Sequence, residues 1–140
     1  QTAKYIASIN NLQLNIDVRL NERKLGNLEE IAEFMKDKKT RDVSEVQLVF
    51  PKFKTSDGES LEETKRRMLD FIIEILEKYK EKRIAVVSHG GSIKFLLLNW
   101  CILNNSKKLE YKGRMLNITS PCLLKLTFSD KKLIDLIQVI

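Results

Sequence analysis

The strongest chemical signal in the sequence is the segment Ser88-His89-Gly90-Gly91, which contains the single histidine of the 140 residues. It follows the apolar run Ile84 to Val87 and precedes the apolar stretch Ser92 to Leu103, and this order predicts a strand, a turn and a helix. In an open α/β sheet, ligands bind beyond the carboxyl ends of the strands, where the next helix offers free amides and a partial positive charge. We therefore expect His89 to lie where an anion such as a phosphate group would bind.

The two glycines after His89 favour the same interpretation. Gly90 and Gly91 have no Cβ atom, so the backbone there can approach a ligand closely. An isolated histidine in such a place more often ends the strand and hydrogen-bonds to the backbone, and the segment taken by itself leaves that structural role open. The rest of the chain must decide between the two roles.

The elements that would position this segment alternate along the chain. Apolar residues at helical spacing predict one helix within residues 1–10 and another over Leu28 to Met35. Leu12 to Asp17 alternates apolar and polar residues and predicts a short strand. Residues 37–58 contain a proline, a glycine and few periodic apolar positions, so we expect a region rich in loops.

Signals are clearer in the second half of the chain. Ser60 and Glu63 have the spacing of a capping box, which predicts a helix from Leu61 to Tyr79. Arg67 follows Glu63 by one helical turn, so we expect it to form a structural ion pair beside the helix rather than to bind phosphate. The continuous apolar run Ile84 to Val87 is typical of a strand that is buried on both faces of a parallel sheet.

Two further strands are expected near the end of the chain. They cover residues 116–128 and 133–139 and are joined by a turn at residues 129–131. The order of helices and strands predicts an α/β fold with a mainly parallel sheet, helices on both of its faces, and a closing C-terminal β-hairpin. We expect residues 1–140 to form a single domain.

Composition and charge limit the function classes. The net charge of +6 favours an anionic substrate, but the basic residues are scattered among acidic ones, so a nucleic-acid partner is not expected. No apolar run approaches the roughly 20 residues that cross a bilayer, and the chain from Gln1 does not resemble a signal peptide, which predicts a cytoplasmic protein without a membrane partner. Cys101 and Cys122 lie in apolar stretches without the spacing of metal ligands, so we expect reduced thiols, no metal and no cofactor.

Four segments, in chain order, resemble motifs of the histidine phosphatase (phosphoglycerate-mutase-like) superfamily. Val87 to Ile93 resembles the motif of its second histidine, and Gln1-Thr2-Ala3 resembles the end of its Arg-Ala-x-Gln-Thr-Ala segment. Arg19 to Glu29 resembles its acid-bearing motif, and Gly58 to Arg67 resembles its capped helix. Each match alone is weak, but four matches in order across residues 1–92 are specific.

This resemblance implies a phosphoryl-transfer mechanism. The second histidine of the family, which holds the transferring phosphoryl group, corresponds to His89. Its general acid corresponds to Glu22, which would protonate the leaving oxygen and later help to activate water. Gly90, Gly91 and Arg19 fall at positions that would bind the phosphate. Burial or a bound phosphate would raise the pKa of Glu22, whereas a neighbouring arginine would lower it, so the direction stays open.

A mechanism with two histidines cannot be completed by a sequence that contains one. We therefore expect the nucleophile, in an Arg-His-Gly motif, to lie upstream of Gln1 together with the family's first strand and helix. In the family that strand pairs beside the strand of the second histidine, so the edge of Ile84 to Val87 would be left open. We expect the 140 residues alone to form a homo-oligomer or a strand-swapped assembly.

Phosphomonoester hydrolysis is the function that the resemblance favours. Glu22 and His89 are 67 residues apart, which is similar to the compact phosphatase branch of the family and leaves little room for the insertion of the mutases. A phosphoglycerate-mutase-type transferase and a catalytically inactive phosphate-binding module are the alternatives. The region from Arg41 to Gly58, with Phe50 and Phe53, is expected to face a small phosphorylated substrate, or else to be an ordinary surface loop.

Overall fold

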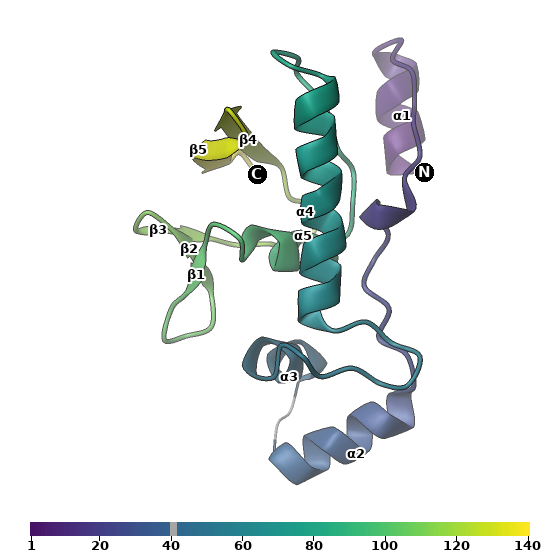
Figure 1. Ribbon diagram of the computed structural model, residues 1–140, viewed down its shortest axis with the longest axis vertical. Coiled ribbons are helices and arrows are strands. Elements are labelled where there is room, and N and C mark those ends of the chain that lie inside the picture. The colour runs from purple at the N-terminus through teal and green to yellow at the C-terminus, as the bar shows by residue number, and fades with distance from the viewer. Residues whose placement is uncertain (40–41) are drawn as a thin grey trace.

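The computed structural model describes residues 1–39 and 42–140, and the long helix α4 is its central element. The helices are α1 (Thr2–Ile9), the short 3-10 helix η1 (Val18–Leu20), α2 (Leu28–Lys38), α3 (Val43–Val49), α4 (Leu61–Lys78) and α5 (Gly90–Leu97). In the view of Figure 1, the strands lie on one side of α4 and α1 lies on the other, while α2 and α3 lie near the end where α4 begins. Helix α5 packs against α4 and carries the His89 segment at its start.

Helix α4 begins at the capping box that the sequence predicts. The Ser60 hydroxyl accepts a hydrogen bond from the Glu63 amide at 3.1 Å, and the Glu63 carboxylate accepts one from the Ser60 amide at 2.9 Å. These two bonds satisfy amide groups that would otherwise lack partners in the first turn. Along the helix, Met68, Phe71 and Ile72 are buried, so the predicted apolar face is confirmed.

The region of residues 37–58 contains a helix that the sequence analysis missed. Helix α3 buries Val46 and Gln47, and its short length leaves too few apolar positions for the helical period to be visible. The aromatic residues nearby pack against α2: the rings of Phe34 and Phe53 stack at 3.9 Å. Arg41, where the predicted substrate-facing region begins, lies outside the described residues.

The strands form two separate antiparallel sheets. They are β1 (Ile102–Leu103), β2 (Leu109–Tyr111), β3 (Arg114–Leu116), β4 (Leu124–Ser129) and β5 (Lys132–Gln138). Strands β1, β2 and β3 form one sheet in that order, and β4 pairs with β5 alone. The predicted C-terminal hairpin is therefore confirmed, although its first strand begins only at Leu124. The helix expected over Ser92 to Leu103 ends instead at Leu97, before β1.

The prediction of a mainly parallel sheet with helices on both faces is wrong. Every strand pair among the described residues is antiparallel. Ile84 to Val87 is not part of a sheet, and Ile84 and Val86 are 41% and 39% exposed. Leu12 to Asp17 is likewise outside any sheet. A parallel strand needs a neighbour brought alongside by a crossover connection, and no described segment takes that place beside Ile84 to Val87.

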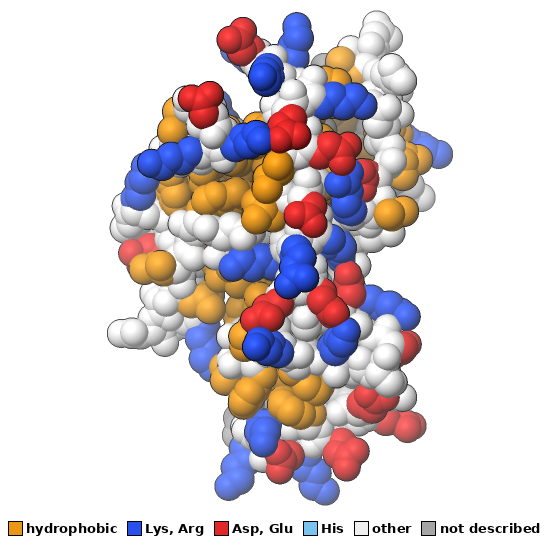
Figure 2. Space-filling model, in the orientation of Figure 1, with side chains coloured by type: hydrophobic (Ala, Val, Ile, Leu, Met, Phe, Trp, Pro, Cys, Tyr) orange, Lys and Arg blue, Asp and Glu red, His pale blue; other side chains and the backbone are white. Residues whose placement is uncertain are grey.

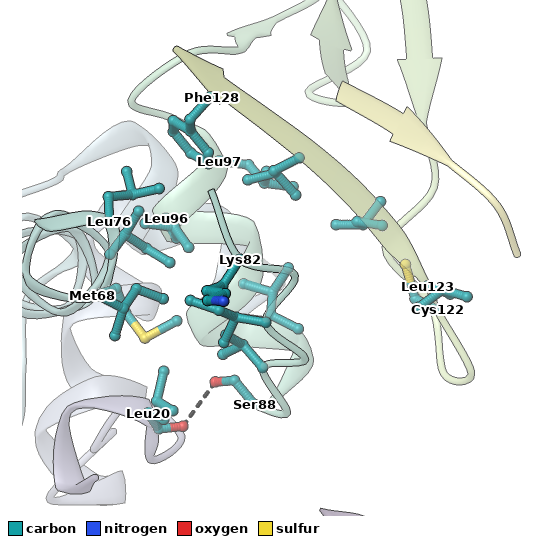
Figure 3. Close-up of a pocket in the computed structure, with 17 residues that line it drawn as sticks. Leu20, Met68, Leu76, Lys82, Ser88, Leu96, Leu97, Cys122, Leu123 and Phe128 are labelled. Atoms are coloured by element: carbon teal, nitrogen blue, oxygen red, sulfur yellow. Dashed lines mark hydrogen bonds between the residues drawn. The ribbon is translucent and has the colours of Figure 1, made fainter. Parts of the chain in front are cut away.

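An apolar cavity lies where α4, α5 and β4 meet. It has a volume of about 240 Å³ and is lined mainly by aliphatic side chains, including those of Ile84 and Val86. Figure 3 shows Met68 and Leu96 on its wall, and the hydrogen bond from the Ser88 hydroxyl to the Leu20 carbonyl among the residues that line it. The cavity therefore borders the segment that leads into His89.

Charged side chains of both signs are distributed over the surface. On the face shown in Figure 2, basic and acidic side chains are interspersed along α4. In the part of the chain that the structure describes, no helix has both the length and the apolar character that crossing a bilayer requires. Both cysteines are free, and Cys101 is buried.

The exposed apolar segment generates a prediction about assembly. We expect the 140-residue chain to elute as an oligomer, because Ile84 and Val86 present apolar side chains on a segment outside any sheet. Replacing both with lysine should shift the chain toward a monomer in size-exclusion chromatography with light scattering. Ile134→Lys is the matched control, since Ile134 is 47% exposed but lies on the paired strand β5. A monodisperse wild-type monomer with cooperative melting would contradict this expectation.

Candidate active site

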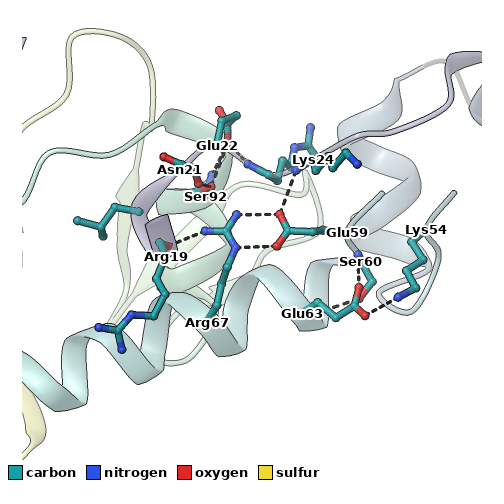
Figure 4. Close-up of polar contacts among 12 residues, drawn as sticks. Arg19, Asn21, Glu22, Lys24, Lys54, Glu59, Ser60, Glu63, Arg67 and Ser92 are labelled. Atoms are coloured by element: carbon teal, nitrogen blue, oxygen red, sulfur yellow. Dashed lines mark hydrogen bonds and ion pairs between the residues drawn. The ribbon is translucent and has the colours of Figure 1, made fainter. Parts of the chain in front are cut away.

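The carboxylate of Glu22 lies at the N-terminus of α5. Its Oε1 atom accepts hydrogen bonds from the Ser92 amide at 2.9 Å and the Ser92 hydroxyl at 3.1 Å, and its Oε2 atom accepts one from the Gly91 amide at 3.3 Å. The first amides of a helix have no partner within the helix and favour negative charge. Glu22 thus occupies the place where the sequence analysis expected an anion, as Figure 4 shows for Glu22 and Ser92.

The two glycines of the segment differ in what surrounds them. A Cβ atom on Gly91 would lie 2.8 Å from Oε1 of Glu22, closer than such atoms approach in proteins. A Cβ atom on Gly90 would meet nothing within 4 Å. Of the two glycines, Gly91 is therefore the one whose backbone is closely approached, and the approaching group is a carboxylate of the chain itself. The approach of a ligand stays a prediction.

The pKa of Glu22 is lowered from its ordinary value of 4.5. Partial burial raises the pKa, but the hydrogen bonds from the Arg23, Gly91 and Ser92 amides and from the Ser92 hydroxyl stabilise the charged form and outweigh it. The pKa shift of Glu22, whose direction the sequence left open, is therefore downward. Its main cause is hydrogen bonding from amides and from the Ser92 hydroxyl rather than an arginine side chain. In this conformation Glu22 is a carboxylate at neutral pH.

His89 is the N-cap residue of α5, and its side chain is exposed. Its backbone is extended, with φ of −112° and ψ of 154°, and its side chain makes no capping hydrogen bond. The neighbouring Ser88 connects this part of the chain to η1 instead: its hydroxyl donates a hydrogen bond to the Leu20 carbonyl at 2.7 Å. The imidazole is therefore not used for the backbone contact of the structural alternative, and it stays accessible to a ligand.

Arg19, a predicted phosphate ligand, is not brought to this site. Its guanidinium contacts the carboxylates of Asp17 at 2.6 Å and Glu74 at 2.8 Å and lies 5.3 Å above the ring of Phe71. The hydrogen bond from Arg19 is the first cause of the lowered pKa of Asp17. In Figure 4 the side chains of Arg19 and Glu22 point in different directions.

Arg23 is the cation that the sequence analysis did not assign to the site. Its Nε atom lies 3.0 Å from the place where a Cβ atom on Gly91 would be, and its guanidinium lies 4.9 Å above the ring of Phe95. It also donates a hydrogen bond to the side-chain amide oxygen of Gln47. Partial burial lowers the pKa of Arg23, and the carboxylates of Glu22 and Asp42 oppose that effect. In the sequence, the one indication that Arg23 belongs to the site is its position next to Glu22.

The backbone of the Glu22 segment is held by contacts to several parts of the chain. The carbonyl of Arg19 accepts a hydrogen bond from Arg67 at 2.6 Å, and that of Asn21 accepts one from the Ser92 hydroxyl at 2.9 Å. Arg67 also forms an ion pair with Glu59. The structural ion pair predicted for Arg67 is therefore present, but its partner is Glu59 rather than Glu63.

A comparison with protein families identifies the superfamily of this chain. The model of the histidine phosphatase superfamily (branch 1) matches residues 1–133. The chain belongs to the histidine phosphatase superfamily. No curated protein and no solved structure matches the sequence significantly. Within the described residues of this superfamily member, no cluster of three or more histidine, cysteine, aspartate or glutamate side chains is arranged to hold a metal ion.

The environments of the two glycines give a first prediction for this candidate site. Gly91→Ala should displace the Glu22 carboxylate, because the new methyl group would need the space of Oε1. Gly90→Ala is the matched control: it adds the same methyl group one residue earlier, into open space, and should leave Glu22 in place. The NMR chemical shift of the Glu22 carboxyl carbon measures the difference between the two variants. Equal chemical shifts would contradict the close approach of Glu22 to Gly91.

A second prediction concerns pH. Because the pKa of Glu22 is lowered, its bonds to α5 stabilise the fold above pH 4.5, and this stabilisation is lost as the pH falls through the lowered value. Ser92→Ala should raise the pKa of Glu22, since it removes the hydroxyl bond. An NMR titration of carboxyl carbons measures the change, with Glu63 as internal control because Lys54 is the first cause of its lowered pKa. An unchanged Glu22 titration would count against the geometry.

Proposed function

We propose that this chain supplies the general acid Glu22 and the second histidine His89 of an enzyme that hydrolyses phosphomonoesters through a phosphohistidine intermediate. Membership of a superfamily of phosphatases and mutases supports phosphoryl-transfer chemistry in general. The observation that carries the proposal is the start of α5: its amides already bind an anionic group, and the histidine at its N-cap has an exposed side chain without a capping bond.

A substrate phosphate would compete with Glu22 for the start of α5. The amides of Gly91 and Ser92 suit phosphate oxygens as well as they suit a carboxylate, and Arg23 adds positive charge beside them. Once displaced, Glu22 would lose the bonds that lower its pKa and would gain a negatively charged neighbour. Both changes raise its pKa, so phosphate binding itself would convert Glu22 from a bound carboxylate into a proton donor.

The proposed reaction then has two steps. A histidine nitrogen attacks the phosphorus atom, a P–N bond forms, the P–O bond of the ester breaks, and the leaving oxygen takes the proton of Glu22. Water next attacks the phosphohistidine, the P–N bond breaks, and Glu22 accepts a proton from the water as phosphate forms. His89 and the amides of α5 hold the phosphoryl oxygens. Because the sequence contains one histidine, the attacking histidine would come from outside these residues.

The region after α2 supports the proposed substrate-facing role in part. Gln47 on α3 accepts a hydrogen bond from Arg23 and donates one to the Glu59 carbonyl at 2.7 Å, so α3 borders the site. Phe50 and Phe53 pack with Phe34 instead, and we assign them to the support of α3.

We propose the cytoplasm as the place of action, and the free thiols of both cysteines fit this location.

Replacing His89 tests the proposal. In the intact protein, His89→Ala should lower the rate of phosphate release from phosphomonoesters by about a thousandfold, in line with the loss of a group that stabilises transferring charge. The melting temperature should change by no more than a few degrees, because an exposed N-cap side chain contributes little packing. A large loss of stability, or unchanged activity, would contradict the assignment.

Glu22→Gln completes the same experiment. This variant should lose activity on alkyl phosphates, whose leaving oxygen needs a proton, and keep much more of it on p-nitrophenyl phosphate, whose leaving group does not.

The products formed by the wild-type protein distinguish the alternative functions. Inorganic phosphate released to water would support hydrolysis. Transfer of the phosphoryl group to a second hydroxyl would support the mutase alternative, and no turnover by the intact protein would support a phosphate-binding module.

A further inference from the structure

We propose that Arg67 and Glu59 are positioning residues that hold the Glu22 segment in register with α5. This inference rests on the proposed function, since it assigns the pair to the placement of the general acid. The two residues belong to different parts of the chain: Glu59 precedes α4, and Arg67 lies within it. Neither side chain is bonded to Glu22 itself, so their effect on it must pass through the backbone.

Arg67 uses its guanidinium in two directions at once. Its Nε and Nη2 atoms donate to the two carboxylate oxygens of Glu59 at 2.7 and 2.8 Å, and its Nη1 atom donates to the Arg19 carbonyl at 2.6 Å. The side chains of Arg67 and Glu59 are only 19% and 26% exposed, so water screens this pair less than a surface ion pair. Figure 4 shows Arg67 between Glu59 and the Arg19 backbone.

Glu59 holds the other side of the segment. Its Oε2 atom accepts a hydrogen bond from the Lys24 amide at 3.0 Å, and its own amide donates to the Lys24 carbonyl at 2.7 Å. The hydrogen bond from Arg67 is the first cause of the lowered pKa of Glu59, which keeps this carboxylate charged. The ion pair therefore fixes the backbone at Arg19 and at Lys24, three residues before and two residues after Glu22.

The segment between these two points needs such anchors, because residues 21–27 belong to no helix or strand. The Glu22 carboxylate lies 2.9 and 3.3 Å from two α5 amides, so a shift of its backbone would move the proposed acid away from the place where phosphate would bind. An arginine is required rather than a lysine: only the planar fork can bond both oxygens of a carboxylate and a carbonyl at the same time. Misplacement of a catalytic group by about 1 Å costs on the order of a hundredfold in rate.

The test compares Arg67→Lys and Arg67→Met with Lys54→Met in the intact protein. Lys54→Met is the matched control, since it breaks the ion pair with Glu63 near the start of the same helix without touching residues 19–24. For both Arg67 variants, we expect kcat on an alkyl phosphate to fall about tenfold to a hundredfold, because Glu22 is no longer held near the leaving oxygen. The NMR titration of Glu22 should move toward its ordinary pKa of 4.5. Lys54→Met should change neither quantity.

Two results would overturn the inference. One is an unchanged Glu22 titration and kcat in both Arg67 variants, whatever their melting temperatures, because a purely structural pair alters stability alone. The other is wild-type behaviour of Arg67→Lys, which would show that the fork is not needed. If Arg67→Met does not fold, Arg67→Lys decides. If the wild-type protein hydrolyses no phosphomonoester, the proposed function fails, and the Glu22 titration still decides the positioning role.

Discussion

Three successive carbonyl groups, those of Arg19, Leu20 and Asn21, each accept a hydrogen bond from a different part of the chain: Arg67 on α4, Ser88 before α5, and Ser92 within α5. These bonds hold the end of η1 and the residue that follows it, because the backbone acceptors are satisfied by side chains from other elements. The next residue is Glu22, whose carboxylate accepts hydrogen bonds from Gly91 and Ser92 at the start of α5. The geometry of the whole candidate site depends on this set of bonds.

The start of α5 attracts anions and is already bound to a carboxylate of the same chain. Its free amides attract an anion, and the chain provides its own anion in Glu22, so the site is already filled in the absence of a substrate. The same contact favours glycine at position 91, since a side chain there would displace the Glu22 carboxylate. In the proposed reaction, an entering phosphate would exchange with Glu22, which would couple substrate binding to the protonation state of the proposed acid.

Helix α4 links this site to the hydrophobic core. One face buries Met68, Phe71 and Ile72 against α5 and its neighbours, whereas Arg67 on another face reaches the backbone of the Glu22 segment. The capping box at Ser60 fixes where the helix begins, and Glu59 precedes it directly. A shift of α4 would therefore move both Arg67 and Glu59 relative to Glu22, so the packing of the core and the arrangement of the site are connected through one element.

Features that depend on neighbours in sequence could be predicted, and features that depend on distant residues could not. The helices α1 and α4, the capping box and the C-terminal hairpin follow from periodicity, capping and turn residues within a few positions. The family could be predicted from four motifs in chain order.

The prediction of a parallel sheet was wrong, because an apolar run does not reveal whether a neighbouring strand exists. The contacts of Glu22 with Gly91 and Ser92 join residues 69 and 70 positions apart. The sequence by itself determined the local elements and the chemical groups, while only tertiary packing decided which groups meet, because long-range contacts leave no periodic signal in the chain.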